Sequence, residues 1–358
     1  MACFERRKSR EIRIGNQIIG GNAPISIQSM TNTDTYDLDA TYAQVKALEE
    51  AGCNIVRITV PKADAAPIFT FLKEKGIKIP LVADIHFSHE AALAAVKYGA
   101  DKIRINPGNI GSKDRVKAVV DACSAAGVPI RIGVNSGSLE KSILERYGAP
   151  TAEALAESAL YHIGLLEELN FYDIAVSVKA SDVPTMIAAN RIIAERTPYP
   201  IHLGVTEAGA RTSAVVKSSI GIGTLLAEGI GDTVRVSLTD DPLKEIEAAR
   251  EILKALKLTE GGMEIVGCPT CGRTKINLIS LLSNFEKRIK EEGLDRLNIK
   301  VALMGCVVNG PGEAREADIG IAGGIGEGLI FKKGVPQRKV PEERLIDELI
   351  KEIKETKL

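Results

Sequence analysis

The sequence predicts an α/β protein, a (β/α)8 barrel of the TIM type followed by a small α+β domain. Three observations lead to this prediction. Strand-like and helix-like segments alternate eight times between residue 24 and about residue 256, the alternation then stops at a polar stretch with two glycines at 257–262, and three of the six cysteines lie beyond that stretch. A polar, glycine-containing stretch is typical of a domain boundary. We therefore expect domains at 1–260 and 261–358.

Eight short segments rich in Val and Ile, most of them bounded by Pro, Gly or Asn, are the predicted strands. They are residues 24–29, 54–60, 80–85, 102–106, 129–134, 173–178, 200–205 and 233–238. Between them, apolar residues recur every three or four positions over 38–51, 89–98, 151–170 and 182–196, which predicts amphipathic helices. An open doubly wound sheet seldom holds so many alternations, so a closed parallel barrel is favoured.

The segments on either side of the barrel also have readable patterns. Residues 13–20 resemble a short hairpin with a turn at Gly15-Asn16, which could close the lower end of the barrel. After residue 262, strands are predicted at 264–266, 300–303, 318–321 and 329–332, with helices at 276–292 and 341–356. The second domain is therefore a compact α+β unit.

Composition narrows the classes of partner and the compartment. The formal net charge of −1 argues against a general nucleic-acid or membrane-surface binder, which usually carries an excess of Lys and Arg. The N-terminus lacks the apolar stretch of a secretory signal, and no apolar run approaches the ~20 residues of a membrane span. We expect a cytoplasmic protein, in which disulfides are improbable. The cysteines are then thiols or metal ligands.

Cationic side chains lie near the carboxyl ends of five predicted strands, where barrels carry their chemistry. They are Arg57, Arg104, Arg131, Lys179 and Arg235. Each cation alone could pair with a local carboxylate or extend into solvent. Five converging cations repel one another, by up to roughly 4 kcal/mol per close pair at an effective dielectric near 20, so an anionic ligand is the better explanation for the group. Arginine suits phosphate, and a diphosphate would satisfy several arginines at once.

Other polar residues share the same predicted edge. Asn135, Thr206 and Ser237 could complete a set of donors to the anion. Asp84 and His86 stand close together, and His86 could be an oriented donor or proton carrier, with a structural histidine nearly as good an interpretation. Glu207 is a candidate acid/base or hydroxyl anchor, or a carboxylate that only balances the cations.

The second domain holds a C-x2-C pair, Cys268 and Cys271, and a third cysteine, Cys306, in a loop rich in Gly and Pro. No fourth cysteine follows, and Glu313 is the nearest plausible donor. Spacing alone leaves a three-thiolate zinc site and an iron-sulfur cluster with one non-cysteine ligand about equally favoured. Cys3, Cys53 and Cys123 lie singly and are interpreted as ordinary thiols.

Taken together, these motifs closely resemble the bacterial two-domain 4-hydroxy-3-methylbut-2-enyl diphosphate synthases of the non-mevalonate isoprenoid pathway. The resemblance covers essentially the whole chain. It is carried by SIQSMTNT (26–33), ADIHF (83–87), RINPGN (104–109), RIGVNSGS (131–138), VTEAG (205–209), GCPTCGR (267–273) and NGPGE (309–313).

The resemblance implies a two-electron reduction of 2-C-methyl-D-erythritol 2,4-cyclodiphosphate, with ring opening and loss of water. It implies a [4Fe-4S] cluster whose ligands are Cys268, Cys271, Cys306 and Glu313, with Asn309 nearby, and Glu207 as acid/base, whereas Asp84 and His86 match with less defined roles. The implied diphosphate ligands are Arg57, Arg104, Arg131, Asn135, Lys179, Thr206, Arg235 and Ser237. A flavodoxin or ferredoxin would donate electrons. The chain would work as a homodimer in which the cluster domain of one subunit caps the barrel of the other.

Two other functions keep part of this pattern. A pterin-binding transferase of the dihydropteroate synthase type would use a similar barrel, but it leaves the cysteine domain unexplained. A zinc-stabilised binding protein for a phosphorylated ligand would explain the cations and thiolates without redox chemistry. Iron content separates the redox enzyme from the zinc protein.

Overall fold

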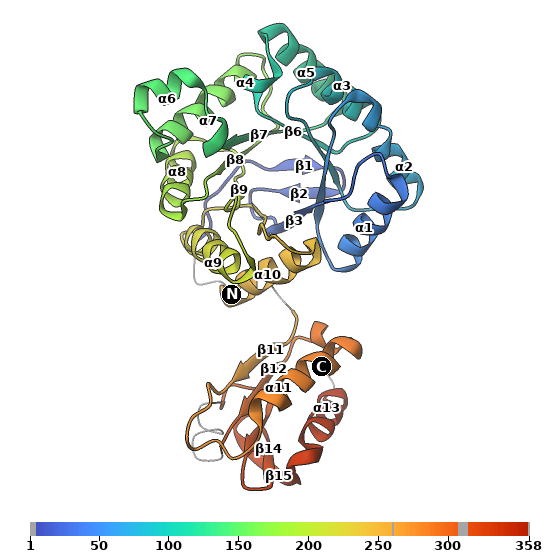
Figure 1. Ribbon diagram of the computed structural model, residues 1–358, viewed down its shortest axis with the longest axis vertical. Helices are drawn as coiled ribbons and strands as arrows, with labels where there is room; N and C mark the ends of the chain where they lie inside the picture. Colours follow the sequence, from blue (N-terminus) through green and yellow to red (C-terminus); the bar gives the residue numbers. More distant parts are fainter. Residues whose placement is uncertain (1–4, 260, 307–313, 357–358) are drawn as a thin grey trace. The chain divides into compact units, whose positions relative to one another are not determined.

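The computed structural model describes residues 5–259, 261–306 and 314–356. The chain divides into two compact units, Met1–Thr259 and Glu260–Leu358. In the first unit, helices surround a ring of strands (Figure 1).

The first unit contains an eight-stranded sheet within its described part. Its strands are β3 (Ser26–Met30), β4 (Ile55–Thr59), β5 (Leu81–Asp84), β6 (Lys102–Ile105), β7 (Ile130–Asn135), β8 (Ile174–Lys179), β9 (His202–Leu203) and β10 (Thr233–Val234). Neighbours pair in parallel in the order β8-β7-β6-β5-β4-β3-β10-β9. A parallel bridge between Val176 and Ile201 joins β8 to β9. The predicted barrel is therefore confirmed.

The helices around the sheet follow the strands in the order expected for a barrel. They are α1 (Leu38–Glu50), α2 (Ile68–Glu74), α3 (His89–Lys97), α4 (Pro107–Ile110), α5 (Lys113–Ala126), α6 (Lys141–Tyr147), α7 (Ala152–Glu167), α8 (Val183–Arg196), α9 (Arg211–Ala227) and α10 (Pro242–Ala255). Several begin at a side chain that accepts a hydrogen bond from a backbone N–H of the first turn, as Asp37, Ser88 and Thr151 do. These caps fix where each helix leaves its loop.

The hairpin expected at the start of the chain forms and closes one end of the barrel. Strands β1 (Ile12–Ile14) and β2 (Gln17–Ile19) pair in antiparallel fashion. Their buried side chains, Ile12, Ile14 and Ile19, form one apolar cluster with Ile55, Val82 and Ala175, which belong to β4, β5 and β8. Figure 1 shows the two strands crossing the ring. With this end filled, the opposite end, where the strands finish, is left for a ligand.

The second unit contains a five-stranded sheet in its described residues. The strands β11 (Glu264–Gly267), β12 (Lys300–Met304) and β13 (Ile319–Gly323) are parallel, and β14 (Glu327–Lys332) and β15 (Val335–Pro341) continue the sheet in antiparallel fashion. Helices α11 (Leu278–Glu291) and α13 (Leu345–Glu355) contribute to the apolar cluster on one side of it. Short 3-10 turns lie at Ala63–Ala65, Ser136–Ser138, Leu294–Arg296 and Glu342–Arg344. Among the helices described, none is both long and apolar enough to cross a membrane.

Candidate active site

A polar cavity of about 100 Å³ lies at the end of the barrel where the strands finish. Its lining comes from strands β4 to β8 and from the segments that continue β5, β9 and β10. It consists of Arg57, Asp84, His86, Arg104, Asn135, Ser177, Lys179, Thr206, Arg235 and Ser237. The structure thus brings nine of the predicted barrel-site residues together. Ser177 was not predicted, although it lies two residues before Lys179 and so faces the same side of β8.

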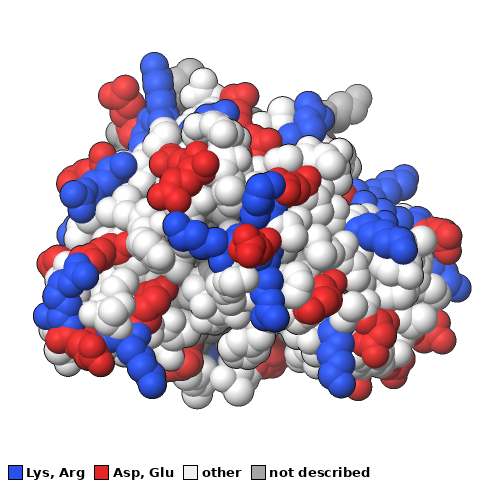
Figure 2. All heavy atoms as spheres, turned by 90° about the horizontal axis from the view of Figure 1, so that it is seen from above, with Lys and Arg blue, Asp and Glu red and all other residues white. Residues whose placement is uncertain are grey.

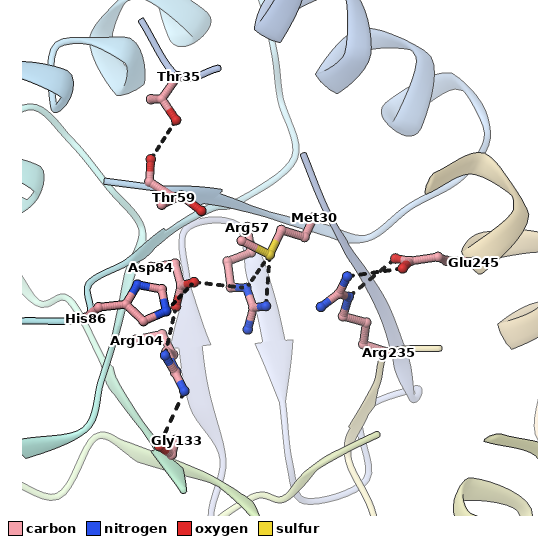
Figure 3. A network of polar contacts seen from close by, with 10 residues as sticks. All are labelled: Met30, Thr35, Arg57, Thr59, Asp84, His86, Arg104, Gly133, Arg235 and Glu245. Carbon is pink, nitrogen blue, oxygen red and sulfur yellow. Dashed lines mark hydrogen bonds and ion pairs between the residues drawn. The ribbon is translucent and has the colours of Figure 1, made fainter. Parts of the chain in front are cut away.

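Asp84 is the central counter-charge of this cavity. Its carboxylate lies 3.2 Å from Nη1 of Arg104 and 3.8 Å from Nε of Arg57, and Nε2 of His86 is 3.8 Å away (Figure 3). Burial alone would raise the pKa of Asp84, but Arg57 and Arg104 hold that pKa at about 2. The carboxylate is therefore ionised at neutral pH and orients both guanidinium groups.

A second carboxylate, Glu245 of α10, holds Arg235. Its two oxygens accept hydrogen bonds from Nη2 and Nε of Arg235 at 3.1 and 3.3 Å, and from the Ser29 hydroxyl at 2.7 Å. Glu245 is only 3% exposed. Glu245 was not predicted from the sequence, although an acidic residue beside Ile246 on the buried face of α10 is a signal that a buried cation lies opposite.

Two glycines make room for the cations. A Cβ at Gly133 would lie 2.3 Å from Nε of Arg104, and one at Gly204 would lie 2.8 Å from Nζ of Lys179. With its amide oriented to satisfy its neighbours, Asn135 accepts a hydrogen bond from Nη2 of Arg104 at 3.2 Å. The long side chains of Arg104 and Lys179 therefore pass over Gly133 and Gly204, where a larger residue would block them.

The cavity holds more positive than negative charge. Burial, and then Arg235 and the other arginines, lower the pKa of Lys179 well below its ordinary value. Burial also lowers the pKa of Arg57, to about 10, although Asp84 opposes the shift. No carboxylate among the described residues pairs with Lys179. Folding removes water from these cations without giving them enough counter-charge. An anion bound between them would supply that counter-charge.

Arg131 and Glu207 lie outside the cavity lining. Arg131 is fully buried on β7, and none of its three guanidinium nitrogens has a hydrogen-bond partner among the described residues. Glu207 is exposed and has a φ of +51°. A side chain other than glycine in this left-handed region is strained by about 1–3 kcal/mol, and such strain is concentrated near functional sites. The roles of both residues stay predictions.

A larger cavity, of about 510 Å³, lies between α5, α6 and α7. Its charged groups already pair with one another, because Arg146 contacts Glu157, Lys113 lies 3.7 Å from Glu168, and the ring of His162 contacts Glu140. The larger cavity is therefore not the better candidate for the active site. The smaller cavity is the one in which positive charge exceeds negative charge.

In the second unit, two of the three cysteines singled out from the sequence follow neighbouring parallel strands. Cys268 comes directly after β11, and its N–H donates to the Leu303 carbonyl at 3.0 Å, whereas Cys306 comes two residues after β12. The C-x2-C turn is tied to the same edge, because the N–H of Lys275 donates to the Gly305 carbonyl at 3.0 Å.

The thiols at this edge are accessible. Cys271 is exposed, Cys268 and Cys306 are half-buried, and none of the three is in a disulfide. Hydrogen bonds and charge from Arg273 lower the pKa of the Cys271 thiol, which favours the thiolate form that binds metals.

Comparison with known families gives the same division of the chain. The "GcpE TIM-barrel domain" family matches residues 9–250, and the "GcpE protein C-terminal domain" family matches residues 264–355. This chain belongs to the GcpE family. Membership fits both the closed barrel and the separate cysteine-bearing unit.

Curated members of the GcpE family match over nearly their full length. A protein of Ruminiclostridium cellulolyticum is 56% identical, with 99% of each chain covered. One of Clostridium perfringens is 58% identical over 97% of this chain and 99% of its own, and one of Caldanaerobacter subterraneus is 57% identical over 97% of each. All three are named 4-hydroxy-3-methylbut-2-en-1-yl diphosphate synthase (flavodoxin).

Solved structures that are similar to this GcpE chain show the fold alone. The N-acetylneuraminic acid synthetase of Leptospira borgpetersenii aligns with a TM-score of 0.50 at 14% identity, covering 79% of this chain and 98% of its own. The phospho-2-dehydro-3-deoxyheptonate aldolase of Thermotoga maritima also has a TM-score of 0.50, at 15% identity, with 70% and 72% covered. The barrel is shared by enzymes of different chemistry.

Cys268, Cys271 and Cys306 of the GcpE chain are free thiols, the ligand type that both zinc ions and iron-sulfur clusters use. Among the described residues, no three His, Cys, Asp or Glu side chains lie close enough together to hold a metal ion. Glu313 and Asn309, the predicted fourth ligand and its neighbour, lie outside the described residues.

Proposed function

We propose that this chain reduces 2-C-methyl-D-erythritol 2,4-cyclodiphosphate by two electrons, opening its ring with loss of water to give 4-hydroxy-3-methylbut-2-enyl diphosphate. The observation that carries the proposal is the barrel cavity, in which cations outnumber carboxylates. The names of the full-length relatives agree with this activity. A pterin transferase leaves the second unit without a role, and a zinc-stabilised binding protein gives its thiols no redox role.

In this proposal the first unit binds the diphosphate. Arg57, Arg104 and Arg235 are already oriented by Asp84 and Glu245, so they can donate to phosphate oxygens with little loss of side-chain entropy. Lys179 adds a further donor at the cavity wall, one that pairs with no carboxylate of the described residues. Asn135, Thr206 and Ser237 supply neutral donors beside them. Arg131 supports the bound anion from below.

Proton transfer is proposed for the carboxylate and imidazole groups near the cavity. Glu207 stands next to Thr206, which lines the cavity, and its solvent-exposed position gives it access to protons. His86 is half-exposed and near Asp84, so it can exchange protons with solvent while its orientation is held. These two residues are the candidates for protonating the hydroxyl that leaves as water.

In the second unit, Cys268, Cys271, Cys306 and Glu313 would hold a [4Fe-4S] cluster, with Asn309 beside it. Such a cluster supplies electrons one at a time at low potential. A carboxylate ligand binds iron less firmly than a thiolate and can leave one iron open to substrate.

The electron donor and the assembly follow from the same proposal. The relatives' names specify a flavodoxin, and we propose a flavodoxin, or a ferredoxin, as the donor in the cytoplasm. We further propose a homodimer in which the cluster unit of one subunit serves the barrel of the other.

One experiment tests the function and the cofactor together. The chain is purified without oxygen, its iron and sulfide are measured, and turnover of the cyclic diphosphate is followed with reduced flavodoxin. We expect a brown protein with about four iron and four sulfide per chain and formation of the linear diphosphate. Cys271→Ser should lose colour and turnover, whereas the buried Cys123→Ser should keep both. A colourless, zinc-containing and inactive wild-type protein would refute the proposal.

A further inference from the structure

Lys102 is a buried amine beneath the cavity, and nothing in the proposed binding of substrate uses it. It lies on β6 two residues before Arg104, so both side chains point into the barrel. Its side chain is fully buried, and its Nζ has no hydrogen-bond partner among the described residues. A lysine is seldom fully buried without a partner.

The elements around Lys102 present mostly cations and uncharged donors to it. Arg131 of β7 and Arg57 of β4 bring positive charge to Lys102, and His202 of β9, which Lys102 also influences, is buried with no partner at Nε2. On β3, both polar atoms of the Gln28 side chain are also without a partner.

The carboxylates nearby are already engaged. Asp84 of β5 pairs with Arg57 and Arg104, and Glu245 of α10 pairs with Arg235. A protonated Lys102 would therefore be a desolvated charge beside several like charges. An uncharged amine at Lys102 avoids both costs, because it carries no charge to be desolvated and none for Arg131 and Arg57 to repel. Burial, and then Arg131 and Arg57, lower the pKa of Lys102 well below its ordinary value.

We propose that Lys102 is an uncharged amine in the ligand-free protein and takes up one proton from solvent when a diphosphate binds in the cavity above it. This inference rests on the proposed diphosphate site. The bound anion offsets the positive charge that repels an ammonium group at Lys102. The protonation equilibrium of Lys102 therefore shifts toward the ammonium form. The protonated Lys102 then attracts the anion from below.

Linkage fixes the direction of the pH dependence. Ligand binding raises the pKa of Lys102 above its value in the free protein, so protons are taken up between those two pKa values. Within that window, affinity for the diphosphate falls as pH rises. The cyclic diphosphate itself has both phosphorus atoms esterified and no group that titrates near neutrality. The proton must therefore be taken up by the protein.

The test is calorimetric titration of the full-length protein with its cluster oxidised, without reductant and without oxygen, so that the cyclic diphosphate binds and does not react. Titrations near pH 7.5 in buffers of different ionisation enthalpy give the number of protons taken up per ligand bound. We expect at least about one proton for the wild type. Lys102→Met, of similar length and no charge, should still bind the ligand, more weakly, and should take up about one proton fewer than the wild type, because any proton taken up by Lys179 is common to both proteins.

A matched control removes the same charge elsewhere. Lys113 is 82% exposed and pairs with Glu168 outside the barrel, so Lys113→Met should keep the wild-type proton uptake. Unchanged uptake in Lys102→Met, or none in the wild type with binding intact, would overturn the inference and leave the proposed function standing. Failure of the wild type to bind the cyclic diphosphate would overturn both.

A second measurement needs no variant. In protein labelled with ¹⁵N at lysine, the Nζ resonance of an amine is distinct from that of an ammonium group. We expect the Nζ resonance assigned to Lys102 to be that of an amine in the free protein and to move to the ammonium position when the cyclic diphosphate is added. A free protein in which all lysines give ammonium resonances would contradict the proposal, even if Lys102→Met failed to fold.

Discussion

Gly133 is a residue whose missing side chain determines where a neighbouring cation lies. A Cβ at this position would lie 2.3 Å from Nε and 2.9 Å from Cζ of Arg104. Gly133→Ala should therefore displace the guanidinium from Asp84 and weaken binding of the cyclic diphosphate roughly 10- to 100-fold, the size of a lost charge-assisted hydrogen bond. Calorimetric titration checks this. Gly137→Ala, with nothing within 4 Å of the added atom, should bind as the wild type does.

Asp84 gives a pH dependence of stability with a defined sign. Its pKa in the folded protein, about 2, is below the ordinary value of 3.8. Its contribution to the free energy of unfolding is thus present above about pH 4 and is lost as pH falls toward 2. Between pH 5 and pH 3 the stability difference between wild type and Asp84→Asn should shrink by roughly 1 kcal/mol in urea unfolding. A difference that stays constant between pH 5 and pH 3 would contradict the assignment.

At this scale, the sequence predicted which cations converge but not how deep each one lies. The alternation of side chains along a strand identifies the inward residues, and it was enough for Arg57, Arg104, Lys179 and Arg235. Depth depends on the stagger between strands, which short segments do not reveal. For that reason Arg131, expected at the mouth, lies buried below it.

The hairpin β1–β2 acts as an element that stabilises the barrel from below. Ile14 is fully buried in its cluster, whereas Ile18, on the same hairpin, is 39% exposed. Ile14→Ala should lower the free energy of unfolding by about 2–4 kcal/mol, because it leaves a cavity in a packed cluster. Ile18→Ala should change it by less than about 1 kcal/mol. Urea unfolding followed by circular dichroism distinguishes them, and equal effects would mean that the hairpin does not contribute to the barrel core.

Elements were predictable where a strong local pattern coincides with burial. The helix expected at 38–51 is Leu38–Glu50, and the strand expected at 102–106 is Lys102–Ile105. Strand β15 (Val335–Pro341) was missed. It lies at the edge of its sheet with almost every residue exposed and with Pro, Arg and Lys along it. Edge strands with such residues avoid pairing with other chains. The same residues replace the alternation of apolar and polar side chains by which a strand is predicted.

At the scale of the whole molecule, the near-zero net charge conceals an uneven distribution. On the face shown in Figure 2, acidic and basic side chains are interspersed. Inside the barrel, by contrast, the carboxylates that pair with the cations are, among the residues that the structure describes, Asp84 and Glu245. Charge is therefore balanced on that face and concentrated where we propose that substrate binds. Composition alone could not predict this separation, because it depends on which strand residues face inward.

The proposed homodimer makes a prediction that only the assembled protein can test. Arg57→Ala should disable the barrel of a chain and leave its cysteines intact, whereas Cys271→Ser should disable its cluster and leave the barrel intact. Each variant alone should be inactive. If the cluster unit of one subunit serves the barrel of the other, a heterodimer of the two variants has one complete site.

Co-expression of the two variants in equal amounts gives heterodimers in about half of the population, so activity should return to about a quarter of the wild-type level. Anaerobic turnover of the cyclic diphosphate by the co-purified mixture measures it. Wild-type chains co-expressed with the double variant, Arg57→Ala with Cys271→Ser, provide the control for mixing. If each chain used its own cluster, the two single variants together would stay as inactive as they are apart, because neither chain then has both an intact cation cluster and an intact thiolate set.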